Sequence, residues 1–261
     1  MKVAIIHYHL GTSGVSSVIE RGSRELTRRG IAHVILVGQC PQGMSDTLPV
    51  RVVDVLDYSN APLDKQGAEK ILHALHAAAT ESLGAPLDVW HFHNHSLGKN
   101  RAIPLIVSIL ASQRQRLLLH IHDLAEDGRP ENHANISDIP NLYPIAPQIH
   151  YAFINSRDRH HFIKAGLPAA NAHLMPNPVS DADSIPRTTS KTPNTPALLL
   201  CPARGIRRKN IGELIILTLL APKGTRTAIT LAPENSQWLA IHDRWKKFCD
   251  ANHLPVEFAV V

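Results

Sequence analysis

The sequence predicts an α/β protein: a Rossmann-like, doubly wound parallel sheet followed by an incomplete second Rossmann-like domain. Two observations predict it. Short apolar, β-branched runs alternate with helical stretches, which is typical of parallel strands covered by helices. A stretch rich in Pro, Ser, Thr and Asp then interrupts the alternation before it resumes. We expect a first domain over residues 1–180, a linker over 181–196 and a partial second domain over 197–261.

A βαβ unit opens the first domain. Lys2–Tyr8 predicts a buried strand, apolar residues then recur at helical spacing up to Arg29, and Ala32–Val37 predicts the next strand. The turn after the first strand holds only Gly11 and Gly14, so it lacks the GxGxxG pattern of dinucleotide-binding proteins. A loop that needs positive φ explains these two glycines equally well.

The same alternation continues through the rest of the first domain. Residues 124–148 have no clear period and predict a loop with one short helix. The other predicted strands are Val50–Val55, Asp88–His93, Arg116–Ile121, Tyr151–Ile154 and Ala172–Met175, and the predicted helices are Asp64–Leu83, Ala102–Leu110 and a helix that Asn155 and Ser156 cap and that runs to Ala165.

The second domain begins with a strand and a strongly basic turn. Ala197–Cys201 predicts the strand, the turn holds Arg204, Arg207, Arg208 and Lys209, and Asn210 is the expected N-cap of a helix over 211–220. In open α/β sheets ligands bind at the carboxyl ends of strands, and helix N-termini favour anions. The turn therefore indicates a phosphate site, although a solvated basic turn is the alternative.

The second domain is short. A strand at Thr227–Leu231, a helix at Gln237–Asn252 and a strand at Val256–Val261 complete it. It holds about 65 residues, whereas domains commonly reach 100 or more. We therefore expect the chain to be a fragment that stops inside its second sheet.

The composition narrows the classes of function. The net charge of +5 suits an anionic ligand but is too mild and dispersed to indicate a nucleic-acid-binding protein. Three well-separated cysteines favour neither a zinc ribbon nor a disulfide framework, and they fit the reducing cytoplasm. No apolar run reaches the roughly 18 residues that span a bilayer.

Two predicted strands end in histidines that alternate along the chain. They are His91, His93 and His95 on one strand and His120 and His122 on another. Alternating residues share one face of a strand, so the two groups could build a zinc site. The alternative is that these histidines line the core or a cleft. We favour this alternative and expect no metal, because ligand spacing without a matched motif is weak evidence for a metal site. Asp123 could orient His122 as a carboxylate orients a general base.

The order of these segments resembles the retaining GT-B glycosyltransferases, specifically glycosyltransferase family 4 (group 1). The resemblance spans nearly all of the chain. The segments that carry it are KVAIIHYHLGTSGVSSVIERGSRELTRRGIAHVILV, DVWHFHNH, LLLHIHD, YAFINSRDRHHFIKAGLPAANAHLMPNPV and LLLCPARGIRRKNIGELI.

The resemblance implies an enzyme that moves a hexose from a nucleotide-diphosphate sugar to an acceptor hydroxyl with retention and without a metal cofactor. Arg204 and Lys209 would neutralise the donor diphosphate, and His122 would lie near the transferred sugar. The other residues expected to contact donor or acceptor are Gly11, Gly14, His93, Asp123 and Asn177. The acceptor, a sugar, a lipid or a small molecule, and the oligomeric state stay open.

The sequence departs from the family pattern in two places. Ala203 stands where the family usually has glycine before Arg204, and the family's E-x7-E motif would fall beyond residue 261. The chain would then hold half a donor site and be weakly active or inactive alone. Three other functions stay open: a non-catalytic module that binds a sugar phosphate or a protein, a metallohydrolase built on the histidines, and a Rossmann dehydrogenase.

Overall fold

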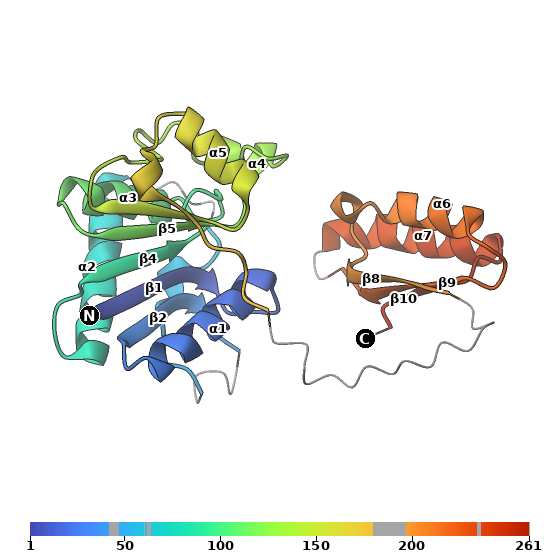
Figure 1. Cartoon of the computed structure of the whole chain (residues 1–261), viewed down its shortest axis with the longest axis horizontal. Helices are drawn as coiled ribbons and strands as arrows, with labels where there is room; N and C mark the ends of the chain where they lie inside the picture. Colours follow the sequence, from blue (N-terminus) through green and yellow to red (C-terminus); the bar gives the residue numbers. More distant parts are fainter. Residues whose placement is uncertain (42–46, 60, 62–63, 180–196, 234–235, 261) are drawn as a thin grey trace. The chain divides into compact units, whose positions relative to one another are not determined.

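The protein is described by a computed structural model over residues 1–41, 47–59, 61, 64–179, 197–233 and 236–260. The chain divides into two compact units, Met1–Asp181 and Ala182–Val261 (Figure 1). The predicted linker over 181–196 lies outside the described residues. Within the described ranges, none of the helices combines the length and apolarity that a bilayer crossing would require.

A seven-stranded parallel sheet forms the centre of the first unit. Its strand order is β3-β2-β1-β4-β5-β6-β7, and every pairing is parallel. The strands are β1 (Lys2–His9), β2 (Ala32–Gln39), β3 (Val50–Val52), β4 (Val89–His93), β5 (Leu117–Ile121), β6 (Ile149–Phe153) and β7 (Ala172–Leu174). The order reverses between β1 and β4, so the carboxyl ends of these two strands form the switch point where open α/β sheets bind ligands.

Helices cover the sheet on both faces, as the predicted doubly wound fold requires (Figure 1). The helix α1 (Gly14–Arg28) packs through Ile19 on the face that holds Ile5 and Ile35. The helices α2 (Lys65–Leu83) and α3 (Ala102–Ser112) pack on the opposite face, and the shorter helices are α4 (Pro130–Ala134) and α5 (Ser156–Lys164). The short helix expected within 124–148 is α4.

Strand alternation decides which side chains lie beneath α1. Ile5 pairs in register with His91 on β4, and His93 pairs with His120 on β5. Because residues in register point to the same side of a sheet, these imidazoles lie on the face that Ile5 shares with α1. Aliphatic packing on this face therefore gives way to histidines over β4 and β5.

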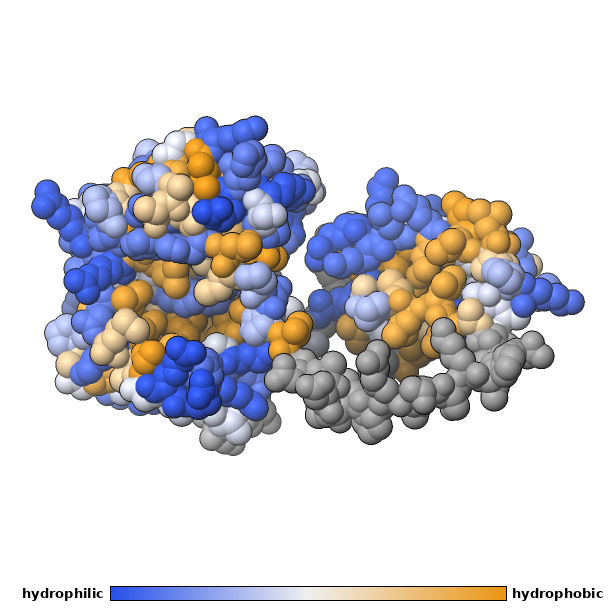
Figure 2. All heavy atoms as spheres, viewed as in Figure 1, coloured by the Kyte–Doolittle hydropathy of each residue, from blue (hydrophilic) through white to orange (hydrophobic). Residues whose placement is uncertain are grey.

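The second unit is a three-stranded parallel sheet in the order β10-β9-β8. Its strands are β8 (Leu198–Arg204), β9 (Arg226–Leu231) and β10 (Val256–Phe258), and its α-helices are α6 (Ile211–Leu220) and α7 (Leu239–Ala251). Ile211, Ile229 and Cys249 form the centre of one core cluster between helices and sheet. Apolar side chains also gather on the surface of this unit, where Leu200 is 57% exposed (Figure 2).

Three predicted strand ends differ from the structure by three residues. β3 ends at Val52 rather than Val55, because a 3₁₀ turn over Asp54–Leu56 carries Leu56 into the core. β8 continues past Cys201 to Arg204 through a register shift in its pairing with β9. β10 ends at Phe258, since Ala259 takes a φ of 55°, which no strand residue adopts. The predicted end of that strand, Val261, lies outside the described residues.

Candidate functional site

The candidate site of the first unit lies at the carboxyl ends of β1, β4 and β5. The glycine turn follows β1, His93 ends β4, and His122 and Asp123 follow β5. Parallel strands bring these three chain segments to one edge of the sheet, at the switch point of the strand order. The sequence-predicted residues of this unit, apart from Asn177, therefore gather at one edge.

Asn94 holds this edge together, although the sequence analysis gave it no role. Its side-chain Oδ1 accepts hydrogen bonds from the backbone N–H groups of His122 at 2.8 Å and Asp123 at 3.1 Å. Its carbonyl accepts a third from the Tyr8 hydroxyl at 2.8 Å. Asn94 is 1% exposed and has a φ of 56°. One buried residue, through its side chain and its carbonyl, thus joins the ends of three strands, and its sequence signal was an asparagine directly after a strand.

The left-handed turn at Asn94 also overturns one expectation. His91 and His93 share a face of β4, but His95 lies beyond the strand, because Asn94 breaks the alternation of side chains. His95 is buried elsewhere, with its Nε2 3.1 Å from the Leu142 carbonyl oxygen. The prediction that all three histidines share one face is therefore wrong.

His122 pairs with His93 rather than with a carboxylate. Nδ1 of His93 lies 2.9 Å from Nε2 of His122. Burial lowers the pKa of His122 to about 4, against an opposing attraction from the Asp123 carboxylate. His122 is therefore a neutral imidazole at neutral pH, and it can donate or accept a hydrogen bond without carrying charge.

Asp123 is engaged by an arginine that the sequence analysis did not single out. Arg129 donates from Nη2 to Oδ1 of Asp123 at 2.7 Å and from Nη1 to the Leu124 carbonyl at 2.9 Å. The carboxylate is thereby anchored to the segment that precedes α4. Asp123 therefore accepts from Arg129, and the His122 ring that it was expected to orient pairs with His93 instead.

The glycine turn is closed by a histidine. The Gly11 N–H donates to Nδ1 of His9 at 3.0 Å, and Ser13 caps α1 by accepting from the Ser16 N–H at 3.0 Å. Neither Gly11 nor Gly14 has a positive φ, so the positive-φ interpretation of these glycines is wrong. No heavy atom of the described residues lies within 4 Å of where a Gly14 Cβ would be, so this backbone is open to a ligand.

The basic turn of the second unit is held by buried residues at both ends. Ile206 and Ile211 are buried, whereas Arg207, Arg208 and Lys209 between them form a short 3₁₀ turn and are exposed. Arg204 is half-buried at the end of β8. The anchors keep the cationic side chains at the carboxyl end of the strand, as the sequence predicts.

Backbone geometry in this turn differs from the expected N-cap. Asn210 precedes α6 in the left-handed conformation, with a φ of 54°, and its side chain makes no capping hydrogen bond. Asn210 thus occupies the predicted N-cap position of α6 but does not cap the helix through its side chain. Gly205 fits closely under α7: an added Cβ would lie 2.6 Å from Nδ1 of His242.

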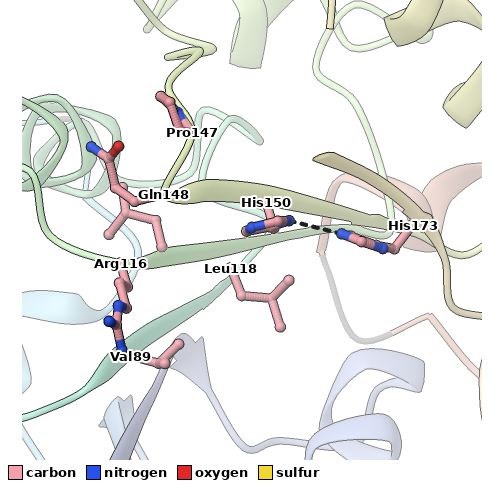
Figure 3. Close-up of a pocket in the computed structure, with 8 residues that line it drawn as sticks. Val89, Arg116, Leu118, Pro147, Gln148, His150 and His173 are labelled. Atoms are coloured by element: carbon pink, nitrogen blue, oxygen red, sulfur yellow. Dashed lines mark hydrogen bonds between the residues drawn. The ribbon is translucent and has the colours of Figure 1, made fainter. Parts of the chain in front are cut away.

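Two further features lie away from these edges. Asn177 is exposed in the segment after β7, where its predicted role stays a prediction. A pocket of about 520 Å³ lies at the amino-terminal ends of β4, β5 and β6, opposite the candidate site, and is lined by Arg116, His150 and His173 among others (Figure 3). His150 Nδ1 and His173 Nε2 are 2.8 Å apart there.

Comparisons with known proteins place the chain among glycosyltransferase-like folds. No protein-family model matches the chain. The mannosylglucosyl-3-phosphoglycerate synthase of Petrotoga mobilis is 30% identical over 258 residues, which cover 89% of this chain and 50% of that protein. The chain thus spans about half the length of this relative.

Solved structures resemble the chain over nearly its whole length. HepE of Anabaena with UDP-glucose has a TM-score of 0.61 at 15% identity, covering 99% of this chain and 68% of HepE. The galactosyltransferase WaaB has a TM-score of 0.59 at 14% identity, with 99% and 67% covered. The catalytic domain of Arabidopsis thaliana starch synthase IV, bound to ADP and acarbose, has a TM-score of 0.57 at 10% identity, with 100% and 74% covered. These likenesses confirm the predicted GT-B fold.

Proposed function

We propose, from the GT-B glycosyltransferase fold, that the protein transfers a hexose from a nucleotide-diphosphate sugar to an acceptor hydroxyl with retention. The observation that carries the proposal is the basic turn at the carboxyl end of β8, where the half-buried Arg204 ends the strand and the exposed Lys209 ends the short 3₁₀ turn before α6. A diphosphate is the part of such a donor that this turn suits.

Charge stabilisation of the leaving group is the central chemical task. In the transfer, the bond between the anomeric carbon and the diphosphate oxygen breaks, the acceptor oxygen takes its place, and the departing nucleoside diphosphate takes up the hydroxyl proton. Arg204 and Lys209 would stabilise the negative charge that develops on the diphosphate. With two cations for this purpose, we propose that the transfer step needs no metal.

The first unit would hold the reacting hydroxyls. Burial lowers the pKa of His122 to about 4, so the ring is neutral and only weakly basic, and it can hydrogen-bond a sugar hydroxyl without taking the acceptor's proton. Asn94 fixes the backbone on which His122 sits. The open backbone at Gly14 offers a further contact to donor or acceptor. We assign His93, Asp123, Gly11 and Gly14 to binding at this edge.

The similar proteins suggest the chemical classes of donor and acceptor. HepE and starch synthase IV were crystallised with UDP-glucose and with ADP, which supports a UDP- or ADP-linked donor beside GDP-linked ones. The Petrotoga mobilis relative is named for a glycosylated 3-phosphoglycerate. We propose an acceptor of the same class, a sugar joined to a small phosphorylated acid. Three unpaired cysteines among the described residues support a cytoplasmic location.

A thermal-shift titration with UDP, GDP and ADP tests the donor site. A nucleotide at 100 times its Kd should stabilise the protein by about 2.7 kcal/mol, which is readily seen as a rise in Tm. The test variant is Arg204→Ala/Lys209→Ala. Its matched control is Arg207→Ala/Arg208→Ala, which removes the same charge from the same turn.

The two variants separate a built site from general attraction. We expect one nucleoside diphosphate to raise the Tm of the wild type and of the control, and not of the test variant. Equal loss in both variants would mean that charge alone attracts the nucleotide. No shift with any of the three nucleotides in the wild type would count against the donor site in this chain.

A further inference from the structure

Three histidines from two strands meet on one face of the first sheet. One ring nitrogen from each of His91, His93 and His120 lies within 4.8 Å of the other two. The rings of His91 and His120 stack with centroids 5.6 Å apart and planes inclined by 10°. His93 and His120 pair directly across β4 and β5, so the backbone register holds the group together.

Three ring nitrogens of this cluster lack hydrogen-bond partners within the described part of the chain. Nε2 of His91 and both ring nitrogens of His120 are closed off from solvent and accept or donate no hydrogen bond there. Buried polar atoms in proteins are nearly always paired, so such a group calls for an explanation. Core packing alone does not explain the histidines, because aliphatic side chains such as Ile5 fill the same face of the sheet on the neighbouring strand β1.

The protonation state suits metal binding. Burial lowers the pKa of His91 to about 3 and of His120 to about 2, and it lowers that of His93 well below its ordinary value. Neighbouring imidazoles contribute to each shift. Burial therefore favours the neutral form of these rings, which is the form that coordinates a metal ion.

The spacing is close to that of a coordination sphere. Zinc bonds to imidazole nitrogen at about 2.1 Å in a tetrahedral arrangement, which places neighbouring ligand atoms about 3.4 Å apart. The observed separations of up to 4.8 Å need side-chain movements of roughly an ångström to close. Imidazole-only ligand sets suit zinc, copper and nickel rather than calcium or magnesium.

We propose that His91, His93 and His120 form a site for a divalent transition-metal ion, Zn²⁺ in the first place, with the fourth position left to water. The ion takes up lone pairs that otherwise lie buried without a partner. The site adjoins the proposed transfer edge along the strands: His93 is hydrogen-bonded to His122, and the His120 ring stacks on the His122 ring with centroids 4.1 Å apart. Its occupancy would stabilise the first unit and set the position of the His122 ring.

Zinc titration of the whole chain tests the site. The protein is stripped with a chelator, dialysed, and titrated with Zn²⁺ in competition with a chromophoric chelator. The variants are His120→Gln and, because His120 is fully buried, His91→Gln on the half-buried ligand as a second. The matched control is His150→Gln/His173→Gln, which removes a touching histidine pair elsewhere in the same unit.

We expect one tight zinc ion per chain and a rise in Tm on binding. Changes to the second shell of metal sites weaken binding about 10- to 100-fold, so loss of a ligand in His91→Gln or His120→Gln should weaken it by at least that much. The control should bind as the wild type does. Equal zinc affinity in the wild type and in His91→Gln would overturn the proposal, as would loss of the tight ion in the control alone.

Discussion

Replacing Asn94 by alanine tests the tie between the strand ends at the candidate site. The substitution removes the acceptor of two backbone N–H groups, those of His122 and Asp123. A buried donor left unpaired costs about 1–3 kcal/mol, and the Asp123 N–H, on a half-buried residue, should cost less than that of His122. Alanine at a φ of 56° adds about 1 kcal/mol. We expect a loss of roughly 3–5 kcal/mol in the free energy of unfolding of the first unit.

Fluorescence can report this unit alone. The protein has three tryptophans, of which only the buried Trp90 belongs to the first unit. In a Trp238→Phe/Trp245→Phe background, urea unfolding followed by emission therefore measures the first unit. Asn94→Gly is the control for backbone strain, since it loses the same hydrogen bonds and tolerates positive φ. It should lose about 1 kcal/mol less than alanine. An alanine variant within about 0.5 kcal/mol of the background would refute the reasoning.

Three further outcomes follow from glycines and from one ion pair. Gly205→Ala should lower the Tm of the second unit and weaken nucleotide binding, because the added Cβ would lie 2.6 Å from the His242 ring. Gly212→Ala is the control, since its Cβ would lie 3.9 Å from the nearest atom, and it should change neither the Tm nor nucleotide binding. Equal effects of the two substitutions would contradict the role of Gly205. Gly14→Ala should fold normally, with urea stability within about 1 kcal/mol, and lower affinity only if a ligand contacts this backbone. Arg101 donates two hydrogen bonds of 2.6 Å to Asp138 and lowers the pKa of that carboxyl. The pair therefore stabilises the fold above the unfolded pKa, and its contribution is lost as pH falls through the folded pKa. By NMR, Arg101→Gln should raise the Asp138 pKa, and an unchanged pKa would contradict the assignment.

Most of the secondary structure was predictable because the buried strands are largely apolar. β1 and β2 are buried along nearly their full length, and their β-branched runs stand out against the polar loops. The boundaries that failed are those set by backbone conformation. Ala259 ends β10 with a positive φ, and a 3₁₀ turn ends β3 at Val52. Neither position carries glycine, the usual signal for such a change.

The candidate site was predictable only in part. Polar residues at strand ends mark the edge where parallel strands place their ligands, so His93, His122 and the turn that begins after Arg204 were accessible from the pattern. The roles of Asn94 and Arg129 were not predictable from the sequence. Asn94 contacts His122, 28 positions away, and Arg129 contacts Asp123, 6 positions away, and no local sequence pattern encodes either contact. The pairing of His122 with His93 likewise depends on which strands are neighbours.

By itself, the sequence determined the alternation of strands and helices, the division of the strands between two units and the basic turn at the end of one strand. All three features depend on local composition and periodicity. Strand order and register were decided only by the tertiary structure. They bring His91 and His93 of β4 against His120 of β5, bury their ring nitrogens and lower their pKa values. Burial and neighbouring charge are properties of the folded surroundings, and those surroundings turn a run of histidines into a candidate metal site.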